Sequence, residues 1–197
     1  MNSQDNMTNV SDICIIATSY DLKKRASELV KKNNDSICVF KASLLEGLTC
    51  AQKLVDKGAK VIITRRGTKN LIEANTDFSV VEIPITLSDY IPVIQKARDI
   101  GGKTAVFYFE EIAEDVKIIF KLMNIDVNYY YFDHSDQCKE IVRAAIRDGA
   151  VLGVGGSLTR YYAKKYGLNY IEIESSDESI MNAVQTAKQL LKIQDEE

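Results

Sequence analysis

Short apolar runs alternate with longer amphipathic stretches from about residue 12 to the end of the chain. The apolar runs are typical of strands buried on both faces, and the longer stretches keep the apolar spacing of helices, as Ile180, Val184 and Ala187 do. This alternation predicts a parallel α/β protein. Strands are expected near 12–17, 36–40, 60–64, 80–83, 103–108, 126–131, 150–154 and 169–173. Helices are expected near 21–32, 44–57, 68–75, 88–100, 111–122, 136–148, 158–166 and 177–193.

The apolar pattern repeats when the sequence is shifted by 90 residues, which places Val81-Glu82-Ile83 on Ile171-Glu172-Ile173. An internal duplication explains this repeat; the alternative is that any two βαβα segments share such a rhythm. Four expected strands on each side of about residue 87 favour two small sheets over one large sheet. We therefore expect an α/β fold of two Rossmann-like lobes, each a small parallel sheet with flanking helices, with a ligand cleft between them.

This division gives the expected domain boundaries. Residues 1–9 are expected to be a disordered tail, residues 10–87 the first lobe and residues 88–176 the second lobe. The C-terminal helix, residues 177–197, is a candidate to rejoin the first lobe.

Composition argues against several classes of protein. Twenty-five Lys and Arg residues against 28 Asp and Glu residues give a net charge of -3 with no basic stripe, so no direct nucleic-acid contact is expected. The single histidine excludes metal sites built on several imidazoles. The four cysteines form no CxxC pair, which is typical of buried thiols in a reducing compartment. No signal peptide or membrane-spanning segment is evident, so a cytoplasmic location is expected.

Familiar cofactor motifs fail at particular positions. Gly153-Val-Gly155-Gly156-Ser157-Leu158 begins like a dinucleotide fingerprint, but Leu158 stands where the third glycine belongs. Arg66-Gly67-Thr68-Lys69 has the wrong order for a phosphate-binding loop. We therefore expect no cofactor, no metal and no catalytic residues.

Small polar residues occupy the strand-to-helix turns. Thr64-Arg65-Arg66-Gly67-Thr68 follows one strand, and Gly155-Gly156-Ser157 follows its counterpart. In an open α/β sheet such turns lie at the carboxyl ends of strands, where helix N-termini present free N–H groups and a positive dipole end. Both turns therefore suit a small anionic ligand. The alternative is that Thr68 and Ser157 cap their helices.

Three further stretches fit helix caps as well as ligand contacts. Ser175 and Glu178 have the spacing of a capping box, as do Ser43 and Glu46. Thr86-Leu-Ser88-Asp89 follows the fourth strand of the first half. Capping alone would explain all three stretches.

These segments resemble a known family. Ile63-Thr64-Arg65-Arg66-Gly67-Thr68, Val81-Glu82-Ile83 and Ser175-Ser176-Asp177-Glu178-Ser179-Ile180 are similar to the N-terminal sensory domain of propionate catabolism activators, which are bacterial sigma-54-dependent transcription regulators. The resemblance runs from about residue 10 to residue 190. It implies two Rossmann-like lobes that sense a small acid, 2-methylcitrate in the type members, and inhibit an attached ATPase until the ligand binds.

The resemblance marks Thr64, Arg65, Gly67 and Thr68 on one lobe and Gly155, Ser157, Ser175 and Ser179 on the other as ligand-binding residues. The chain departs from the family pattern at positions 66 and 176, where Arg and Ser replace glycine. The expected ligand-binding residues are Thr18, Ser19, Thr64, Arg65, Arg66, Gly67, Thr68, Gly155, Gly156, Ser157, Ser175, Ser176 and Ser179.

We therefore expect a ligand-sensing domain for a small anionic metabolite, such as a methylcitrate-like polycarboxylate. Its expected partners are ATPase and DNA-binding modules of the same or a longer chain; no membrane partner is expected, and a homodimer stays open. The alternative is a stand-alone enzyme on a two-lobed scaffold like that of a chelatase or a racemase. The candidate groups of that enzyme are Cys14, Cys38, Glu110, Glu111 and His134.

Overall fold

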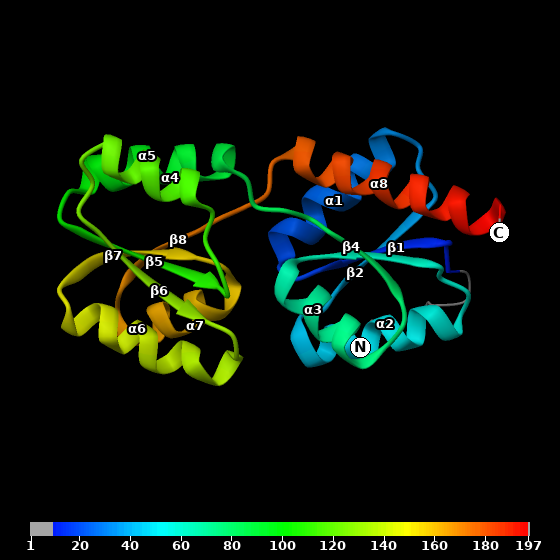
Figure 1. Cartoon of the computed structure of the whole chain (residues 1–197), viewed down its shortest axis with the longest axis horizontal. Helices are drawn as coiled ribbons and strands as arrows, with labels where there is room; N and C mark the ends of the chain where they lie inside the picture. Colours follow the sequence, from blue (N-terminus) through cyan, green and yellow to red (C-terminus); the bar gives the residue numbers. More distant parts are fainter. Residues whose placement is uncertain (1–9, 197) are drawn as a thin grey trace. The chain divides into compact units, whose positions relative to one another are not determined.

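In the computed structural model, which describes residues 10–196, strands and helices alternate along the whole chain (Figure 1). Each expected strand and helix is present, so the expected α/β pattern is confirmed; the expected tail, residues 1–9, lies outside the described residues. The strands are β1 (Ile13–Ala17), β2 (Ile37–Lys41), β3 (Val61–Thr64), β4 (Ser79–Glu82), β5 (Lys103–Phe109), β6 (Val127–Phe132), β7 (Ala150–Gly155) and β8 (Asn169–Glu172). The helices are α1 (Tyr20–Lys32), α2 (Leu44–Asp56), α3 (Arg66–Asn75), α4 (Leu87–Ile100), α5 (Glu114–Leu122), the short 3-10 turn η1 (Ser135–Gln137), α6 (Cys138–Arg147), α7 (Ser157–Tyr166) and α8 (Asp177–Glu196).

The strands form two separate parallel sheets with the same strand order. One sheet has the order β2-β1-β3-β4 and the other has the order β6-β5-β7-β8. In the first sheet Cys14 of β1 pairs with Cys38 of β2 on one side and with Ile62 of β3 on the other. Two parallel sheets with flanking helices confirm the expected fold class, and the shared order agrees with a duplication. The ligand cleft expected between the lobes stays a prediction.

The chain divides into two compact units, and one of them is discontinuous. Unit 1 comprises the chain up to Pro84 together with the segment from Ser175 onward, and unit 2 is Ile85–Glu174. The first and last segments meet because α8 lies beside α1 on one face of the unit 1 sheet (Figure 1). Ile180 and Val184 of α8 are buried there with Ile15 and Ile63 of the strands.

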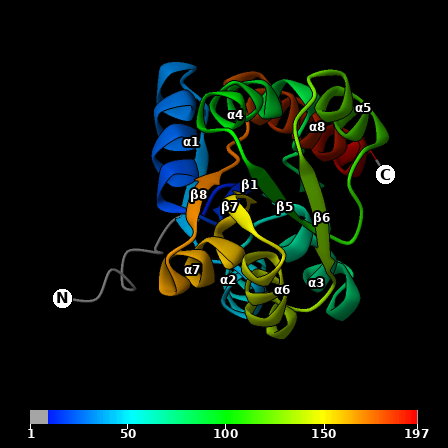
Figure 2. The same cartoon turned by 90° about the vertical axis from the view of Figure 1, so that its left-hand side faces the viewer.

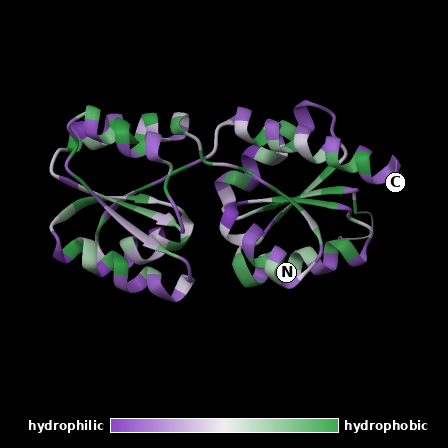
Figure 3. Cartoon of the chain, in the orientation of Figure 1, coloured by the Kyte–Doolittle hydropathy of each residue, from purple (hydrophilic) through white to green (hydrophobic). Residues whose placement is uncertain are grey.

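Each sheet is covered by helices on both faces. In unit 1, α2 and α3 cover the face opposite α1 and α8, where Leu54 and Ile72 pack on Ile16. In unit 2, α4 and α5 cover one face and α6 and α7 cover the other (Figure 2). The strands of unit 1 are mostly hydrophobic and its helices alternate between hydrophobic and hydrophilic residues (Figure 3), as burial of one helix face requires. No helix among residues 10–196 is long and apolar enough to cross a membrane.

The helix caps differ in part from the expected ones. Thr86 and Asp89 form a capping box at the start of α4, so the alternative of a capping role is confirmed for this stretch. The expected box between Ser43 and Glu46 is wrong, since the Ser43 side chain makes no cap hydrogen bond. The expected box that begins at Ser175 is displaced by one residue, because the Ser176 hydroxyl accepts the Ser179 N–H at 3.1 Å and caps α8.

Candidate functional site

The strand order creates one position in each sheet where loops open toward opposite faces. In a doubly wound sheet the chain leaves in opposite directions from two adjacent central strands, and ligands bind outside the carboxyl ends of those strands. These strands are β1 and β3 in unit 1 and β5 and β7 in unit 2. We call the place between the two strands of each pair the switch point of that unit. The loops that follow these four strands are therefore the candidate site, and each unit has two of them.

In unit 1, Thr18 and Ser19 form the loop after β1. The Ser19 hydroxyl accepts the Leu22 N–H at 3.1 Å and so caps α1. Thr64, at the end of β3, is buried, and its hydroxyl donates to the Ile16 carbonyl at 2.8 Å. This bond fixes the carboxyl ends of β1 and β3 against each other.

Arg65 and Arg66 stand between β3 and α3. Arg65 is half-buried and occupies the N-cap position of α3, where it makes no side-chain cap hydrogen bond. The Arg66 guanidinium donates from Nε to a Glu82 carboxylate oxygen at 2.9 Å, so this side chain is directed to the end of β4. Arg66 therefore pairs with the carboxylate that ends the neighbouring strand.

Thr68, which follows Gly67 in the first turn of α3, supports another helix. Its buried hydroxyl accepts the Leu44 N–H at 3.0 Å, which satisfies the first amide of α2 in place of Ser43. Thr68 lies so close to Gly47 that a Cβ atom there would be 2.4 Å from its Cγ2. The alternative that Thr68 caps its own helix is therefore wrong, and its contacts are with α2.

In unit 2, Gly155 and Gly156 end β7 and Ser157 begins α7. A Cβ atom on Gly155 would lie 2.8 Å from the Phe107 carbonyl oxygen, so close strand packing requires glycine there. Gly156 is exposed and is the N-cap of α7, without a side-chain cap, so the alternative that Ser157 caps this helix is also wrong. The Gly156 carbonyl accepts the Tyr170 hydroxyl at 2.7 Å.

The three expected serines after β8 lie at the beginning of α8, in unit 1. Ser175 is buried, and its hydroxyl donates to the Pro84 carbonyl at 2.8 Å. Arg25 of α1 donates to the Ser175 carbonyl at 2.6 Å. Ser176 caps α8, and its hydroxyl donates to the Ser179 hydroxyl at 3.1 Å. These contacts give the serines a structural role at the return of the chain to unit 1.

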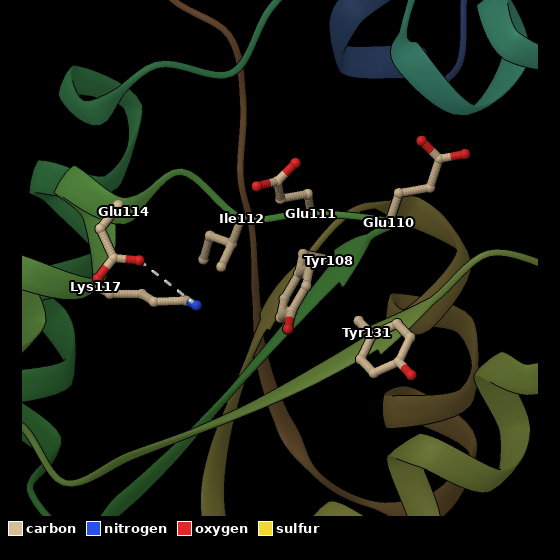
Figure 4. A pocket seen from close by; sticks show the side chains of 7 residues that line it. All are labelled: Tyr108, Glu110, Glu111, Ile112, Glu114, Lys117 and Tyr131. Atoms are coloured by element: carbon tan, nitrogen blue, oxygen red, sulfur yellow. Dashed lines mark ion pairs between the residues drawn. The ribbon is translucent and has the colours of Figure 1, made fainter.

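A pocket of about 180 Å³ in unit 2 contains residues that were not among the expected ligand contacts. It lies at the carboxyl ends of β5 and β6 and at the start of α5 (Figure 4). Aromatic residues near the ends of two neighbouring strands were the sequence signal, but aromatic residues in strands also predict core positions. Its lining residues are Tyr108, Glu110, Glu111, Ile112, Glu114, Lys117 and Tyr131.

The candidate groups of the alternative enzyme are divided between the two units. Cys14 and Cys38 lie in adjacent strands of unit 1, where burial raises the pKa of the Cys14 thiol to about 12. A thiol with such a pKa is a poor nucleophile at neutral pH, because the thiolate is the reactive form. Glu110, Glu111 and the exposed His134 belong to unit 2. Among residues 10–196 no three His, Cys, Asp or Glu side chains form a group that could hold a metal ion.

The fold and the switch-point loops together define a class: paired doubly wound α/β units of the kind that bind small molecules at the carboxyl ends of their strands. Residues 31–197 match the family model described as propionate catabolism activator, and the chain belongs to this family. The family resemblance drawn from the sequence is therefore confirmed, and the chain is a regulatory domain of this activator type.

Solved structures share the fold at low sequence identity. An NtrC family transcriptional regulator from Clostridium acetobutylicum has a TM-score of 0.83 and 21% identity, over 92% of this chain and 97% of that chain. An ABC domain from Streptococcus pneumoniae in complex with L-Trp has a TM-score of 0.51 and 10% identity, over 95% of this chain and 85% of that chain. No curated protein sequence matches the chain significantly.

Proposed function

We propose that the chain is the ligand-sensing domain of a sigma-54-dependent transcriptional activator, and that its ligand is a small carboxylated metabolite. The observation that carries this proposal is Arg65, which stands at the uncapped N-terminus of α3 beside the switch point of unit 1. The guanidinium group binds carboxylates through two parallel hydrogen bonds. The helix N-terminus adds N–H donors and the positive end of the helix dipole.

Family membership supports a regulatory role without chemistry of its own. The ATPase and DNA-binding modules that such a domain controls are proposed to belong to the same or a longer chain, and direct contact of this domain with nucleic acid is not proposed. A homodimer is compatible with this function. The alternative enzyme is not proposed, because burial raises the pKa of the Cys14 thiol, its candidate nucleophile, to about 12.

A thermal-shift screen of the purified chain against di- and tricarboxylates, monocarboxylates and neutral analogues tests the proposal. A ligand present at 100 times its dissociation constant stabilises the folded state by about 2.7 kcal/mol, which is easily detected. We expect a stabilising carboxylate, and we expect its ester to have no effect. A screen in which no carboxylate stabilises the chain would contradict the proposed function.

A further inference from the structure

The pocket of unit 2 has a charge opposite to the one that a carboxylated ligand requires. Glu110, Glu111 and Glu114 contribute three carboxylates to its lining, whereas Lys117 contributes one ammonium group. That ammonium group already has a partner, because Lys117 Nζ lies 3.8 Å from a Glu114 carboxylate oxygen (Figure 4). The pocket is therefore a poor site for an anion and a good one for a cation.

Aromatic rings give the same pocket an affinity for organic cations. The rings of Tyr108 and Tyr131 lie 6.2 Å apart, with 30° between their planes. Lys117 Nζ lies 5.8 Å from the centroid of the neighbouring Tyr129 ring, within the range of a cation–π contact. A tyrosine that neighbours Tyr108 therefore already contacts one ammonium group of the protein itself.

At the corresponding positions of unit 1, a tyrosine ring contacts an ammonium group of the same unit. A shift of 90 residues places Tyr131 on Lys41 and Glu110 on Tyr20. In unit 1 the Lys41 ammonium lies 4.8 Å above the Tyr20 ring, so unit 1 supplies its own cation. In unit 2 the equivalent positions hold a ring and a carboxylate, and neither of them carries an ammonium group.

We propose that the pocket formed by Tyr108, Glu110, Glu111 and Tyr131 binds the ammonium group of a small organic amine. The volume of about 180 Å³ is below the roughly 300–1,000 Å³ of pockets for drug-sized ligands, so it suits a group of side-chain size. The residues of this site belong to unit 2, whereas Arg65 of the proposed carboxylate site belongs to unit 1.

Titration of the isotopically labelled chain with n-butylammonium chloride, followed by amide chemical shifts, tests this assignment. Sodium butyrate, which has the same alkyl chain and the opposite charge, is the ligand control. We expect saturable shifts at residues 108–117 and at Tyr131 with the amine and not with butyrate. The assignment is overturned if the amine causes no saturable shifts there, or if butyrate causes the same ones.

Two variants locate the site. Glu110→Gln with Glu111→Gln is expected to weaken amine binding at least tenfold, and Tyr131→Ala, at an exposed position, is expected to weaken it severalfold. The matched control is Glu28→Gln with Glu46→Gln, which removes the same charge from exposed positions on α1 and α2. Equal amine affinity in the wild type and in both pocket variants would overturn the proposal. Carboxylate binding measured on the same variants tests the Arg65 site separately, so the two proposals can fail independently.

Discussion

The Ser175 hydroxyl donates a hydrogen bond to the Pro84 carbonyl at 2.8 Å, and this bond joins the two segments through which the chain passes between its units. Arg25 strengthens the junction from α1, since it donates to the Ser175 carbonyl at 2.6 Å and pairs with Asp177 at 3.5 Å. The chain thus leaves unit 1 and returns to it at one hydrogen-bonded place. Any ligand-dependent change in the path of these two connecting segments should therefore be detectable at Pro84 and Ser175.

Ser175→Ala is expected to destabilise unit 1 by about 1 kcal/mol, because the hydrogen bond from the buried Ser175 hydroxyl to the half-buried Pro84 carbonyl is lost. Urea denaturation followed by circular dichroism measures this change. The control is Ser27→Ala on α1, where the hydroxyl bonds an exposed helical carbonyl, and alanine there is expected to be neutral or slightly stabilising. A Ser175 variant as stable as the wild type would show that the junction bond contributes little.

Arg65→Ala is expected to weaken carboxylate binding by about 2 kcal/mol, or roughly thirtyfold, because a charged hydrogen bond is lost. Arg66→Ala removes the same charge one residue away but breaks only an exposed pair with Glu82, which is worth about 0–1 kcal/mol. Calorimetric titration of both variants with the ligand found in the screen compares them. Equal losses in the two variants would indicate a general charge effect and argue against a specific contact of Arg65.

Gly47→Ala is expected to destabilise unit 1 by about 1–3 kcal/mol, despite the better helix propensity of alanine, because the new methyl group would overlap the Thr68 Cγ2 atom. Thr68→Ser removes that carbon and keeps the hydroxyl that accepts the Leu44 N–H. The double variant should therefore be more stable than Gly47→Ala alone. Thermal melting of the two single variants and the double variant tests this, and a lack of recovery would place the strain elsewhere.

Cys14 and Cys138 are buried in different units, and burial raises the pKa of each thiol to about 12. We expect both to resist iodoacetamide at pH 8.5 in the native chain and to react once their unit unfolds, since the thiolate is the reactive form. Mass spectrometry of partly denatured samples then reports the unfolding of each unit separately. Rapid labelling of Cys14 in native buffer would contradict its burial.

The raised pKa values of the same two thiols predict that the folded state loses stability at alkaline pH. An unfolded thiol ionises near its ordinary pKa of 9.0, whereas the folded thiol stays protonated until about 12. The folded state therefore binds more protons in this interval, and its stability should fall as the pH rises from about 9 to 12. Denaturation midpoints measured at pH 8, 9 and 10 should decline in that order. A midpoint that is constant over this range would mean that the two thiols titrate normally in the folded chain.

The sequence predicted the elements and the fold class because both depend on local apolar spacing. The strand and helix pattern needs only a few neighbouring residues to be recognised, and the repeat after 90 residues extends it to two sheets. The partners of single polar side chains depend on distant residues. Thr68 bonds Leu44, and Ser175 bonds Pro84, which is 91 positions away, so local capping rules assigned these hydroxyls incorrectly.

The pocket of unit 2 illustrates the same limit. Tyr108 and Tyr131 lie in strands, where aromatic residues usually serve the core, and Glu110 and Glu111 were connected with catalysis instead. Only the pairing of Tyr108 with Tyr131 in adjacent strands shows that these aromatic and acidic residues share one pocket.

The discontinuity of unit 1 has a consequence for synthesis on the ribosome. Its core contains Ile13 from the first strand and Val184 from the last helix, so it cannot be completed until nearly the whole chain has been translated. Unit 2 is one continuous segment, Ile85–Glu174, and all of it is translated before α8. Because domains generally fold as units while the chain grows, the unit that is translated second can be the first to reach its native state.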